Sequence, residues 1–549
     1  MALSTLTERE RLLRVLYINS ANSSYAVGNI DLYKGFSSEA TYSLIHEAVK
    51  TNLEGLLSLI QQANSDKNLP NRVILFYYLA NILNLNDISD ESKHRVTSLV
   101  LEICQSDQEF FDFIKYHSKT RLKKSKLSHT VIKAVGKFYN RKSPLELAQS
   151  YAKFNRYHKW SHKDLIKLAH VKSDTATKNI VINYILKQTD SDAEPQEAKD
   201  IINRIKKSEE LRKTSDSLKA VEIITEFDYS IHQVNPDLHQ TKDVWTAVLS
   251  NMLLKEILPC LGKLYKLGLL KQNSPVHAFL LDIFTNAEKV KASGVHPIDV
   301  FSYMKKLEKG GRPIDPKLLH HLQNDKKLSE EELKKAKTRT EAKCPSILTA
   351  LENCFTLACK NVIPTKKRYL ISIDVTEKAM NSHCIGNKTL NCVEAAVSFA
   401  LVLLKVEEHV TIATYFNDRI NIINVHKDIS FADLVENVCS KKSSYSLYSS
   451  SFEWASKENK LFDVFINFIH HRFRENIPKT EKLSRFQTEP LEKYRESSRL
   501  PDAKLVMVCP SSPNFVAAGS QDIPNMIDVL GFDASACKVI ECFSRGTFR

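Results

Sequence analysis

Glycine is scarce in this chain of 549 residues: it has thirteen glycines, whereas glycine makes up roughly 7% of an average protein. This scarcity disfavours glycine-rich phosphate-binding loops and β folds with many tight turns, and it favours helices. The sequence also lacks any run near the roughly 18 apolar residues that a membrane-spanning helix needs. Its N-terminal stretch is charged and has no apolar core of a secretory signal. We therefore expect a soluble intracellular protein, in the cytoplasm, with the nucleus as an open alternative.

Motifs for metal binding and catalysis are also missing. Eleven cysteines are scattered from Cys104 to Cys542 without one C-x-x-C pair, a pattern typical of buried or free thiols in a reducing compartment. The pair His470-His471 has no second histidine pair or carboxylate cluster at ligand spacing, so we predict no zinc site. No paired carboxylates can be assigned to acid–base catalysis either. We therefore predict a protein without enzymatic activity and without a cofactor.

The positive charge of the chain is concentrated in residues 115–172, called the basic segment below. It holds sixteen Lys or Arg against Glu146 and Asp164, a balance of +14. The whole protein has 78 basic and 64 acidic residues, which is also +14, so 62 of each remain outside the segment. Clustered cations on a folded surface bind polyanions, because each neutralised phosphate releases condensed counterions. The sequence therefore predicts one nucleic-acid-binding surface on an otherwise neutral protein.

The stretch WSHKDLIKLAH, residues 160–170, is the most specific element of the basic segment. Read as a helix, it places Lys163, Lys167 and His170 on one face at positions i, i+4 and i+7. We take these three residues as candidate RNA contacts. Further candidates precede them in the segment, at Lys119, Arg121, Lys123, Lys124, Lys126, Lys133 and Lys137.

Aromatic residues are interleaved with these cations, at Phe138, Tyr139, Phe154, Tyr157 and Trp160. Cations for phosphates and flat rings for exposed bases form the composition of a single-stranded RNA site. The alternative interpretation places the rings in the core and the lysines on a solvated rim. For each ring taken singly we favour the core, and for the charge cluster as a whole we favour RNA binding.

The chain changes character near residue 345. Up to that point it reads as helix after helix, and segments such as 73–86 and 220–234 carry apolar residues at three- and four-residue spacing. Short polar breaks separate these segments. Many short helices in pairs predict a stacked-helix solenoid, although no strict sequence period is present.

The remaining part alternates strands with helices. Compact apolar runs lie at 368–375, 410–418, 463–469 and 503–509, a long apolar helix lies at 389–405, and a last apolar segment lies at 538–540. This pattern predicts an open α/β sheet with helices on both faces. Ligands of such sheets bind at the carboxyl ends of the strands. Asp374, at the end of the first strand, is therefore a candidate site residue.

Five segments in sequence order resemble the Ro autoantigen family, the SS-A/Ro ribonucleoproteins. They are WSHKDLIKLAH (160–170), DVWTAVLSNMLLKEILPCLGKL (243–264), GVHPIDV (294–300), KRYLISIDV (367–375) and LGFDASACKVI (530–540). The resemblance covers nearly the whole chain. It implies a ring-shaped α-solenoid of HEAT-like repeats, the TROVE module, over residues 1–360. It also implies a doubly wound von Willebrand factor A-like domain over residues 361–549 that closes the ring.

The same resemblance implies a function in small-RNA quality control. The basic hole of the ring would take single-stranded 3′ ends of misfolded non-coding RNAs, and the outer basic surface would bind small Y-type RNAs. Lys163 and Lys167 match family positions that serve Y RNA binding. The implied protein is a monomeric ribonucleoprotein component without a membrane association. An alternative of a different class is a protein-interaction adaptor that acts through the A domain.

The metal-binding motif of the family is altered in this chain. The family has D-x-S-x-S with a later Thr and a later Asp, whereas here Asp374 is followed by Thr376 and Lys378. The later Thr is represented by Ser446, and the later Asp aligns near His470. A divalent ion needs several hard oxygen ligands, so we predict that metal binding at the remnant formed by Asp374, Thr376 and Ser446 is weak or lost. Pairing of Lys378 with Asp374 is an alternative replacement for the ion's charge.

Overall fold

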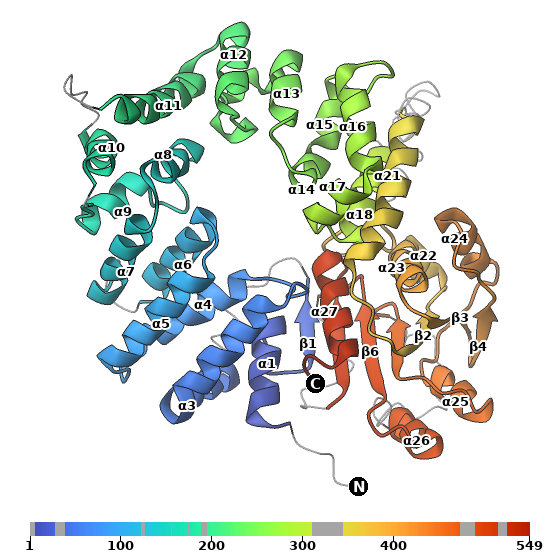
Figure 1. The fold of residues 1–549 in the computed structure, drawn as a ribbon. Coiled ribbons are helices and arrows are strands. Elements are labelled where there is room, and N and C mark those ends of the chain that lie inside the picture. Colours follow the sequence, from blue (N-terminus) through green and yellow to red (C-terminus); the bar gives the residue numbers. More distant parts are fainter. Residues whose placement is uncertain are drawn as a thin grey trace, which may run out of the picture. The chain divides into compact units, whose positions relative to one another are not determined.

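The computed structural model describes residues 6–27, 39–121, 127–154, 156–173, 175–187, 195–309, 344–472, 489–513 and 524–549. The chain forms two compact units (Figure 1). The helical unit comprises Tyr42–Lys67 and Asn71–Leu253. The sheet unit comprises Met1–Thr41, Asn68–Pro70 and Leu254–Arg549.

The helical unit consists of helices joined by short loops, with no strand among its described residues. This unit holds a large part of the helical region that the spacing of apolar residues predicts. The helices are α3 (Glu39–Ser65, which begins in the sheet unit), α4 (Val73–Ile82), α5 (Asp90–Ile103), α6 (Asp107–Thr120), α7 (His129–Asn140), α8 (Pro144–Lys153), α9 (His162–Leu168), α10 (Ala176–Lys187), α11 (Gln196–Lys213), α12 (Ser217–Phe227) and α13 (Lys242–Leu249), with the short 3₁₀ helices η1 (Ile231–Gln233) and η2 (Pro236–Gln240) before α13.

Serine side chains cap the starts of two helices in the basic segment, α8 and α9. The Ser143 hydroxyl accepts a hydrogen bond from the backbone N–H of Glu146, and the Glu146 carboxylate accepts one from the backbone N–H of Ser143. Pro144 follows at the first helical position. Ser161 and Asp164 form the same reciprocal pair at the start of α9. Such capping boxes satisfy N–H groups that have no partner within the helix. The two acidic residues of the basic segment therefore serve as helix caps.

Helices two positions apart in the chain pack against each other in this unit: α4 contacts α6 and α5 contacts α7. Aromatic rings fill the contacts between neighbours. The rings of Phe110 and Phe138 stack at 3.8 Å between centroids, and Phe111 meets the edge of Phe154 at 5.3 Å. Each buried ring removes a large apolar surface from water and stabilises the stack.

The sheet unit is built on a seven-stranded mixed sheet with the order β1-β7-β6-β5-β2-β3-β4. All neighbouring strands are parallel except β3 and β4, which form an antiparallel hairpin. Register is continuous across the centre, where Ile371 of β2 pairs with Ile412 of β3 and Ile466 of β5. The strands are β1 (Ser24–Ala26), β2 (Arg368–Ile373), β3 (His409–Phe416), β4 (Arg419–Ile423), β5 (Val464–Phe468), β6 (Lys504–Cys509) and β7 (Met526–Leu530).

Helices cover both faces of this sheet. Leu370, Tyr415 and Leu505 belong to a buried cluster with residues of α25 (Ser450–Lys457) and α26 (Glu489–Ser498). On the other side, α23 (Cys392–Val406) contacts β2 and β3, and α27 (Ala534–Arg545) contacts β1 and β7. The strands are buried on both faces, which explains their nearly continuous apolar sequences. Two short helices, α22 (Glu377–Asn381) and α24 (Phe431–Cys439), complete this part.

Helices from both ends of the helical sequence region also belong to the sheet unit. They are α1 (Glu8–Ile18), α14 (Leu254–Ile257), α15 (Leu261–Lys266), α16 (Pro275–Thr285), α17 (Ala287–Ser293), α18 (Pro297–Glu308) and α21 (Pro345–Ala358), with the 3₁₀ helices η3 (Leu258–Cys260) and η4 (Cys359–Asn361). Helix α18 packs on α23 and α27. There the imidazole of His296 lies 3.1 Å from the buried carboxylate of Glu541, and Lys309 lies 3.1 Å from Glu394.

The predicted fold class, a many-helix region joined to an α/β sheet, is confirmed by this architecture. The strands differ in part from the sequence prediction. Strands β1, β4 and β7 were not predicted, and the apolar residues 538–540 lie within α27. All eleven cysteines lie in described parts of the chain, and none forms a disulfide. Within the described residues, every helix is too short or too polar to cross a bilayer.

Candidate nucleic-acid interface and strand-end site

Helix α9 presents two of the predicted RNA contacts. Lys167 is exposed and Lys163 is half-buried, and the two are one helical turn apart on the same face. Leu165 and Ile166 are buried beneath them and hold the helix in place. The structure gives neither lysine an ion pair with a carboxylate of the described residues. Both ammonium groups therefore remain accessible to an external anion.

The prediction that His170 continues this helical face is wrong. Helix α9 ends at Leu168, and His170 adopts a left-handed conformation with φ of 47°. The backbone N–H of Val171 donates to the carbonyl of Ile166 at 3.2 Å, and that of His170 donates to Lys167 at 3.3 Å. These two bonds form a Schellman termination, which requires a left-handed residue at the position of His170. His170 is exposed, but it lies beyond the helix.

Helix α7, which packs against α9, carries two more predicted contacts. Lys133 and Lys137 are exposed and lie one turn apart, opposite the buried face of the helix. Upstream, Lys119 is exposed near the end of α6 and Arg121 is half-buried just after it. The remaining predicted contacts lie outside the described residues: Lys123, Lys124 and Lys126.

Part of the positive charge in the basic segment serves the fold itself. Lys142 pairs with Asp107 at 2.9 Å, and both side chains are largely buried. Arg141 donates to the carbonyl of Cys104 at 3.1 Å and covers the ring of Phe138 at 4.8 Å. The balance of +14 therefore overstates the charge that the segment offers to a ligand.

The aromatic residues of the segment divide into two groups. Phe138 and Tyr139 are buried in the core, as we favoured for each ring singly. Phe154, Tyr157 and Trp160 are half-buried. Tyr157 and Trp160 exchange backbone hydrogen bonds of 2.8 and 3.0 Å across a tight turn. This turn directly precedes α9, so its two rings lie beside the start of the helix that carries Lys163.

His162, the first residue of α9, is a core residue. Its Nδ1 lies 2.9 Å from the hydroxyl of Tyr139, and its ring packs on Phe111 and Phe154. Burial lowers the pKa of His162 to about 4, because a charged imidazole cannot be solvated there. Neutral His162 therefore anchors α9 and does not contribute charge to the surface.

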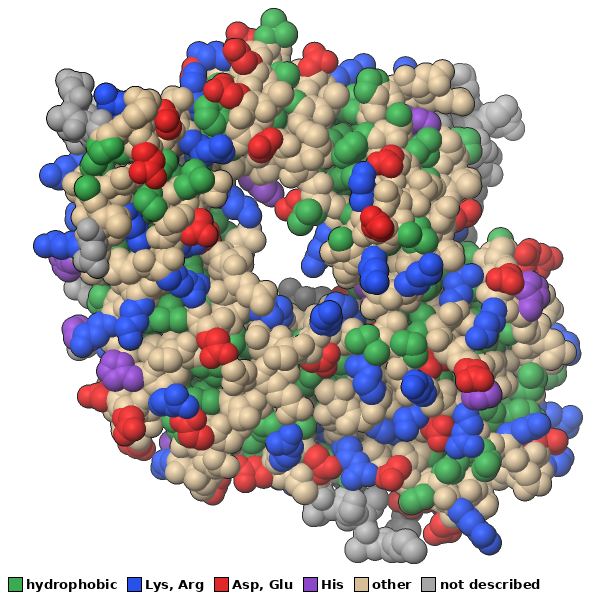
Figure 2. All heavy atoms as spheres, in the orientation of Figure 1, with side chains coloured by type: hydrophobic (Ala, Val, Ile, Leu, Met, Phe, Trp, Pro, Cys, Tyr) green, Lys and Arg blue, Asp and Glu red, His purple; other side chains and the backbone are tan. Residues whose placement is uncertain are grey.

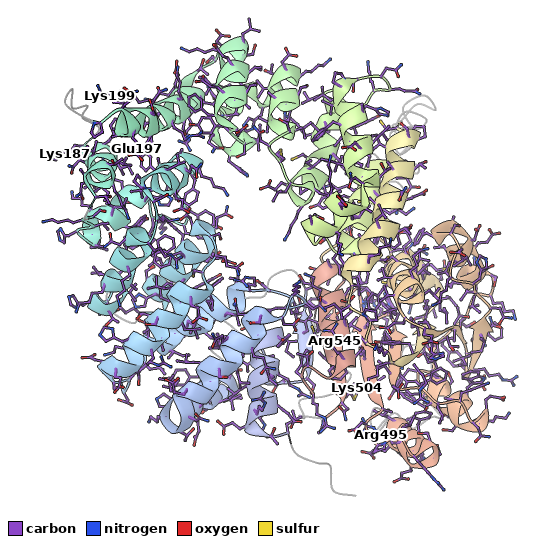
Figure 3. All side chains as sticks on the ribbon, viewed as in Figure 1. Lys187, Glu197, Lys199, Arg495, Lys504 and Arg545 are labelled. Carbon is purple, nitrogen blue, oxygen red and sulfur yellow. The ribbon has the colours of Figure 1, made fainter. Side chains whose placement is uncertain are left out.

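The basic side chains can be followed on the molecular surface. In Figure 2, Lys and Arg side chains lie along the edge of the helical unit where Figure 1 places α7, α9 and α10, and others are spread over the rest of the visible face. Two exposed lysines outside the basic segment, Lys187 of α10 and Lys199 of α11, are labelled in Figure 3. They provide a comparison for the lysines of α9, since they belong to the same unit.

The second candidate site lies at the carboxyl ends of β2 and β5. Asp374 follows β2 and is 3% exposed. Its Oδ1 accepts hydrogen bonds from the backbone N–H of Thr376 at 2.9 Å and from the hydroxyl of Ser446 at 3.0 Å. Its Oδ2 accepts one from the backbone N–H of His470 at 3.0 Å. The structure thus brings together the predicted remnant residues: hydrogen bonds join Thr376 and Ser446 to Asp374, and a third bond comes from His470.

These residues do not match the oxygen-rich donor set of a divalent cation. Three of the roughly four acceptor positions of the Asp374 carboxylate already receive protein hydrogen bonds, and Thr376 Oγ1 accepts from the backbone of Ala379 at 3.4 Å. His470 contributes a backbone N–H where a carboxylate ligand would be needed. In the described parts of the chain no cluster of three or more His, Cys, Asp or Glu is arranged to hold a metal ion.

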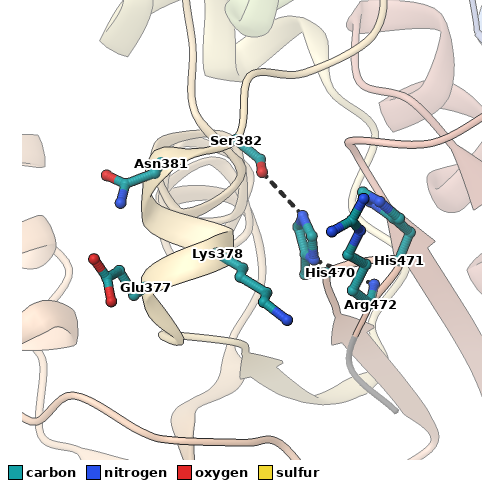
Figure 4. Close-up of a pocket in the computed structure, with 7 residues that line it drawn as sticks. All are labelled: Glu377, Lys378, Asn381, Ser382, His470, His471 and Arg472. Carbon is teal, nitrogen blue, oxygen red and sulfur yellow. Dashed lines mark hydrogen bonds between the residues drawn. The ribbon is translucent and has the colours of Figure 1, made fainter. Parts of the chain in front are cut away.

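A pocket of about 430 Å³ opens beside Asp374 (Figure 4). Sequence reasoning did not find most of its residues, although they follow the ends of β2 and β5, where ligands of such sheets bind. The pocket is lined by Glu377, Lys378, Asn381, Ser382, His470, His471 and Arg472.

The ring of His470 forms one wall of the pocket. Its Nδ1 accepts a hydrogen bond from the backbone N–H of Arg472 at 3.2 Å, and its Nε2 lies 2.9 Å from the hydroxyl of Ser382. Burial, together with the positive charges of His471, Lys378 and Arg472, lowers the pKa of His470 to about 4, against the opposing effect of the negative charge of Asp374. His470 is therefore neutral near pH 7, with its proton on Nε2 directed at Ser382.

The fold and the strand-end site define a helical protein that carries a von Willebrand factor A-type domain. Residues 368–544 match the family model described as the Ro60 vWA domain. The RNA-binding protein RO60 of Caenorhabditis elegans is 24% identical over 502 residues, which cover 82% of this chain and 72% of that protein. The protein of the same name from Deinococcus radiodurans is 25% identical over 411 residues, covering 73% and 69%.

A solved structure shares the fold. The crystal structure of the Deinococcus radiodurans RO (RSR) protein superposes with a TM-score of 0.80 and 18% sequence identity, covering 98% of this chain and all of that one. Residues 368–544 therefore match the Ro60 vWA domain, and most of the chain is similar to the two RO60 proteins. The resemblance seen in the five sequence segments is thereby confirmed.

Proposed function

We propose that this protein is an RNA-binding ribonucleoprotein component that holds Y-type small RNAs and the 3′ ends of misfolded non-coding RNAs. The observation that supports it most is the pair of accessible lysines on α9, Lys163 and Lys167, within the one strongly basic segment of the chain. The two relatives reported above carry the name RNA-binding protein. In this proposal the protein acts without catalysis, as a scaffold in small-RNA quality control.

The proposed contacts to phosphates come from two helices that pack together. Lys163 and Lys167 of α9 and Lys133 and Lys137 of α7 each present a pair of ammonium groups spaced by one helical turn. Phosphates bound by lysines release counterions, which gives affinity without sequence preference. Lys119, Arg121 and His170 extend this set in the proposal, as do Lys123, Lys124 and Lys126, which lie outside the described residues.

Half-buried aromatic rings give the proposed interface a means to contact bases. Tyr157 and Trp160 flank the turn before α9 and keep part of each ring exposed. Single-stranded RNA offers unstacked bases, and aromatic side chains bind them by stacking. Phe138 and Tyr139 take no part in this, since they are buried.

We further propose that residues 1–360 supply the RNA-binding region and that residues 361–549 act as the A domain. A protein-interaction role of the A domain is compatible with this division, because the pocket beside Asp374 lies in the sheet unit, apart from the proposed RNA contacts in sequence. We place the protein in the cytoplasm in this proposal, with the nucleus as the alternative.

A direct test uses matched RNAs and the full-length protein. Two hairpins of identical stem are compared by fluorescence anisotropy, one with a single-stranded 3′ tail and one with a blunt end. The proposal expects the tailed RNA to bind at least about tenfold more tightly, a difference of about 1.4 kcal/mol. Equal affinity for both RNAs would contradict the role in 3′-end recognition. Crosslinking in cells followed by sequencing of the bound fragments then identifies the RNA ligands.

A further inference from the structure

The carboxylate of Asp374 accepts hydrogen bonds from three separate segments of the chain. It receives one bond from Thr376 on its own loop, one from Ser446 in the segment before α25, and one from His470 at the end of β5. Its own backbone N–H donates to Phe468 at 2.9 Å. Hydrogen bonds to a carboxylate are stronger than those between neutral groups. Asp374 thus links the strand ends through hydrogen bonds from protein groups.

The positive charge at this strand end comes from side chains. Lys378 belongs to α22 after β2, and Arg472 follows β5, and both line the same pocket. In Figure 4 the ammonium group of Lys378 points toward the side where His470 and Arg472 lie, whereas Glu377 points away on the opposite side of α22. Lys378 and Arg472, which come from separate elements, therefore flank one part of the pocket. The Glu377 carboxylate, which also belongs to the lining, points away from that part.

The polar neighbours of these cations suit an anionic ligand. Ser382 and Asn381 bring a hydroxyl and an amide to the lining. His471 stacks beside His470, with 4.2 Å between ring centroids, and its Nδ1 lies 3.0 Å from the hydroxyl of Ser511. Neutral His470 has both ring nitrogens engaged by Arg472 and Ser382. The side chains of the lining that carry a permanent charge are Lys378, Arg472 and Glu377.

We infer that this strand-end pocket is a metal-independent oxyanion site, in which Lys378 and Arg472 bind a carboxylate or phosphate group directly. An arginine guanidinium presents paired donors that match the two oxygens of such a group, and a lysine adds a point charge. The position is the one where ligands of parallel sheets bind. This inference concerns the sheet unit and goes beyond the proposed RNA binding by the helical unit.

The test is a titration of the full-length protein, isotopically labelled at histidine, in EDTA. The NMR signal of His471 is assigned with the variant His471→Gln and followed during addition of acetate, of inorganic phosphate, and, without EDTA, of magnesium chloride. The inference expects a saturable shift with at least one of the two anions and none with magnesium. Whichever anion binds more tightly identifies the carboxylate or the phosphate as the chemistry that the pocket prefers.

Three variants distinguish anion binding in this pocket from the general effect of removing one positive charge from the protein. Lys378→Gln and Arg472→Gln should each weaken the anion affinity about tenfold, whereas Lys457→Gln, an exposed lysine at the end of α25, should leave it unchanged. The first two side chains are half-buried or exposed, so the fold is retained and is checked by circular dichroism. Saturable binding of magnesium, no saturable shift with either anion, or equal affinity in all three variants would overturn the inference.

Discussion

The hydroxyl of Ser446 donates a hydrogen bond of 3.0 Å to Oδ1 of Asp374, a residue 72 positions earlier in the chain. Both side chains are buried. The bond links the end of the central strand β2 to the loop that leads into α25. Both positions belong to the altered metal motif of the sequence, and in the structure they are joined to each other. The strand-end region is therefore organised by hydrogen bonds within the protein.

Replacement of Asp374 by Asn tests this organisation. The asparagine side chain has one oxygen that can accept hydrogen bonds and one NH₂ group that cannot. In either orientation the amide therefore loses bonds: the one from His470, or the two from Thr376 and Ser446. We expect Asp374→Asn to lower the free energy of unfolding by about 1–3 kcal/mol, the cost of leaving a buried donor without an acceptor. Thermal unfolding with EDTA and with magnesium should show the same loss. A loss that appears with magnesium and vanishes in EDTA would instead indicate a metal site.

Two variants of His170 distinguish its role in the backbone conformation from a role in contacting RNA. Its left-handed backbone, with φ of 47°, disfavours every residue except glycine and to a lesser extent asparagine. We expect His170→Gly to stabilise the protein by about 1 kcal/mol relative to His170→Ala. Both variants lack the imidazole, so RNA affinity should fall by the same factor in both if His170 contacts RNA. Retention of full affinity in both variants would remove His170 from the interface.

We expect His162 to account for part of the stability that the folded protein loses at acidic pH. Its folded pKa of about 4 lies below the ordinary value of 6.5, so the unfolded chain binds a proton more readily than the folded one between these values. Stability from this group is therefore complete above about pH 6.5 and falls as the pH is lowered toward 4. We expect this residue to contribute about 1 kcal/mol of lost stability between pH 7.5 and 5.5.

The matched variant is His162→Gln, which retains a polar group near Tyr139. Unfolding midpoints of wild type and variant are measured at both pH values. The variant should be less stable at pH 7.5 and should lose less stability on acidification than the wild type. An identical pH dependence in the two proteins would show that His162 is not held neutral in the folded state.

The sequence was most informative where local patterns decide the structure. The apolar runs at 368–375 and 463–469 contain β2 and β5, and the long apolar helix predicted at 389–405 corresponds to α23. It failed where tertiary contacts decide. β1 has three residues, too few for a periodic signal, and forms because β7 offers it an edge. Helix α9 stops at Leu168 although its polar spacing continues, since a buried Val171 closes the Schellman turn.

The candidate sites were predictable to different degrees. Charge clustering and a family motif pointed to Lys163 and Lys167, and a strand end pointed to Asp374. Arg472 and Ser382 gave no signal, because they come together only when the sheet brings the ends of β2 and β5 to one edge. Likewise, no local pattern distinguishes the structural Lys142 from the exposed Lys137, since the difference lies in the nearby Asp107.

The central claim is that localised positive charge on the helical unit binds RNA, and the salt dependence of RNA affinity tests it most directly. Log affinity is measured against log salt concentration for the wild type, for Lys163→Ala/Lys167→Ala, and for Lys187→Ala/Lys199→Ala as the equal-charge control (Figure 3). Each of these exposed or half-buried residues should change stability by no more than about 0.5 kcal/mol.

The account predicts a wild-type slope of about −3 or steeper, with about tenfold weaker binding and a slope shallower by about 1.5 in the α9 double variant. The control pair should match the wild type within about twofold at 0.1 M salt. A flat slope in the wild type, or equal losses in the two double variants, would contradict the assignment of the RNA interface to α9.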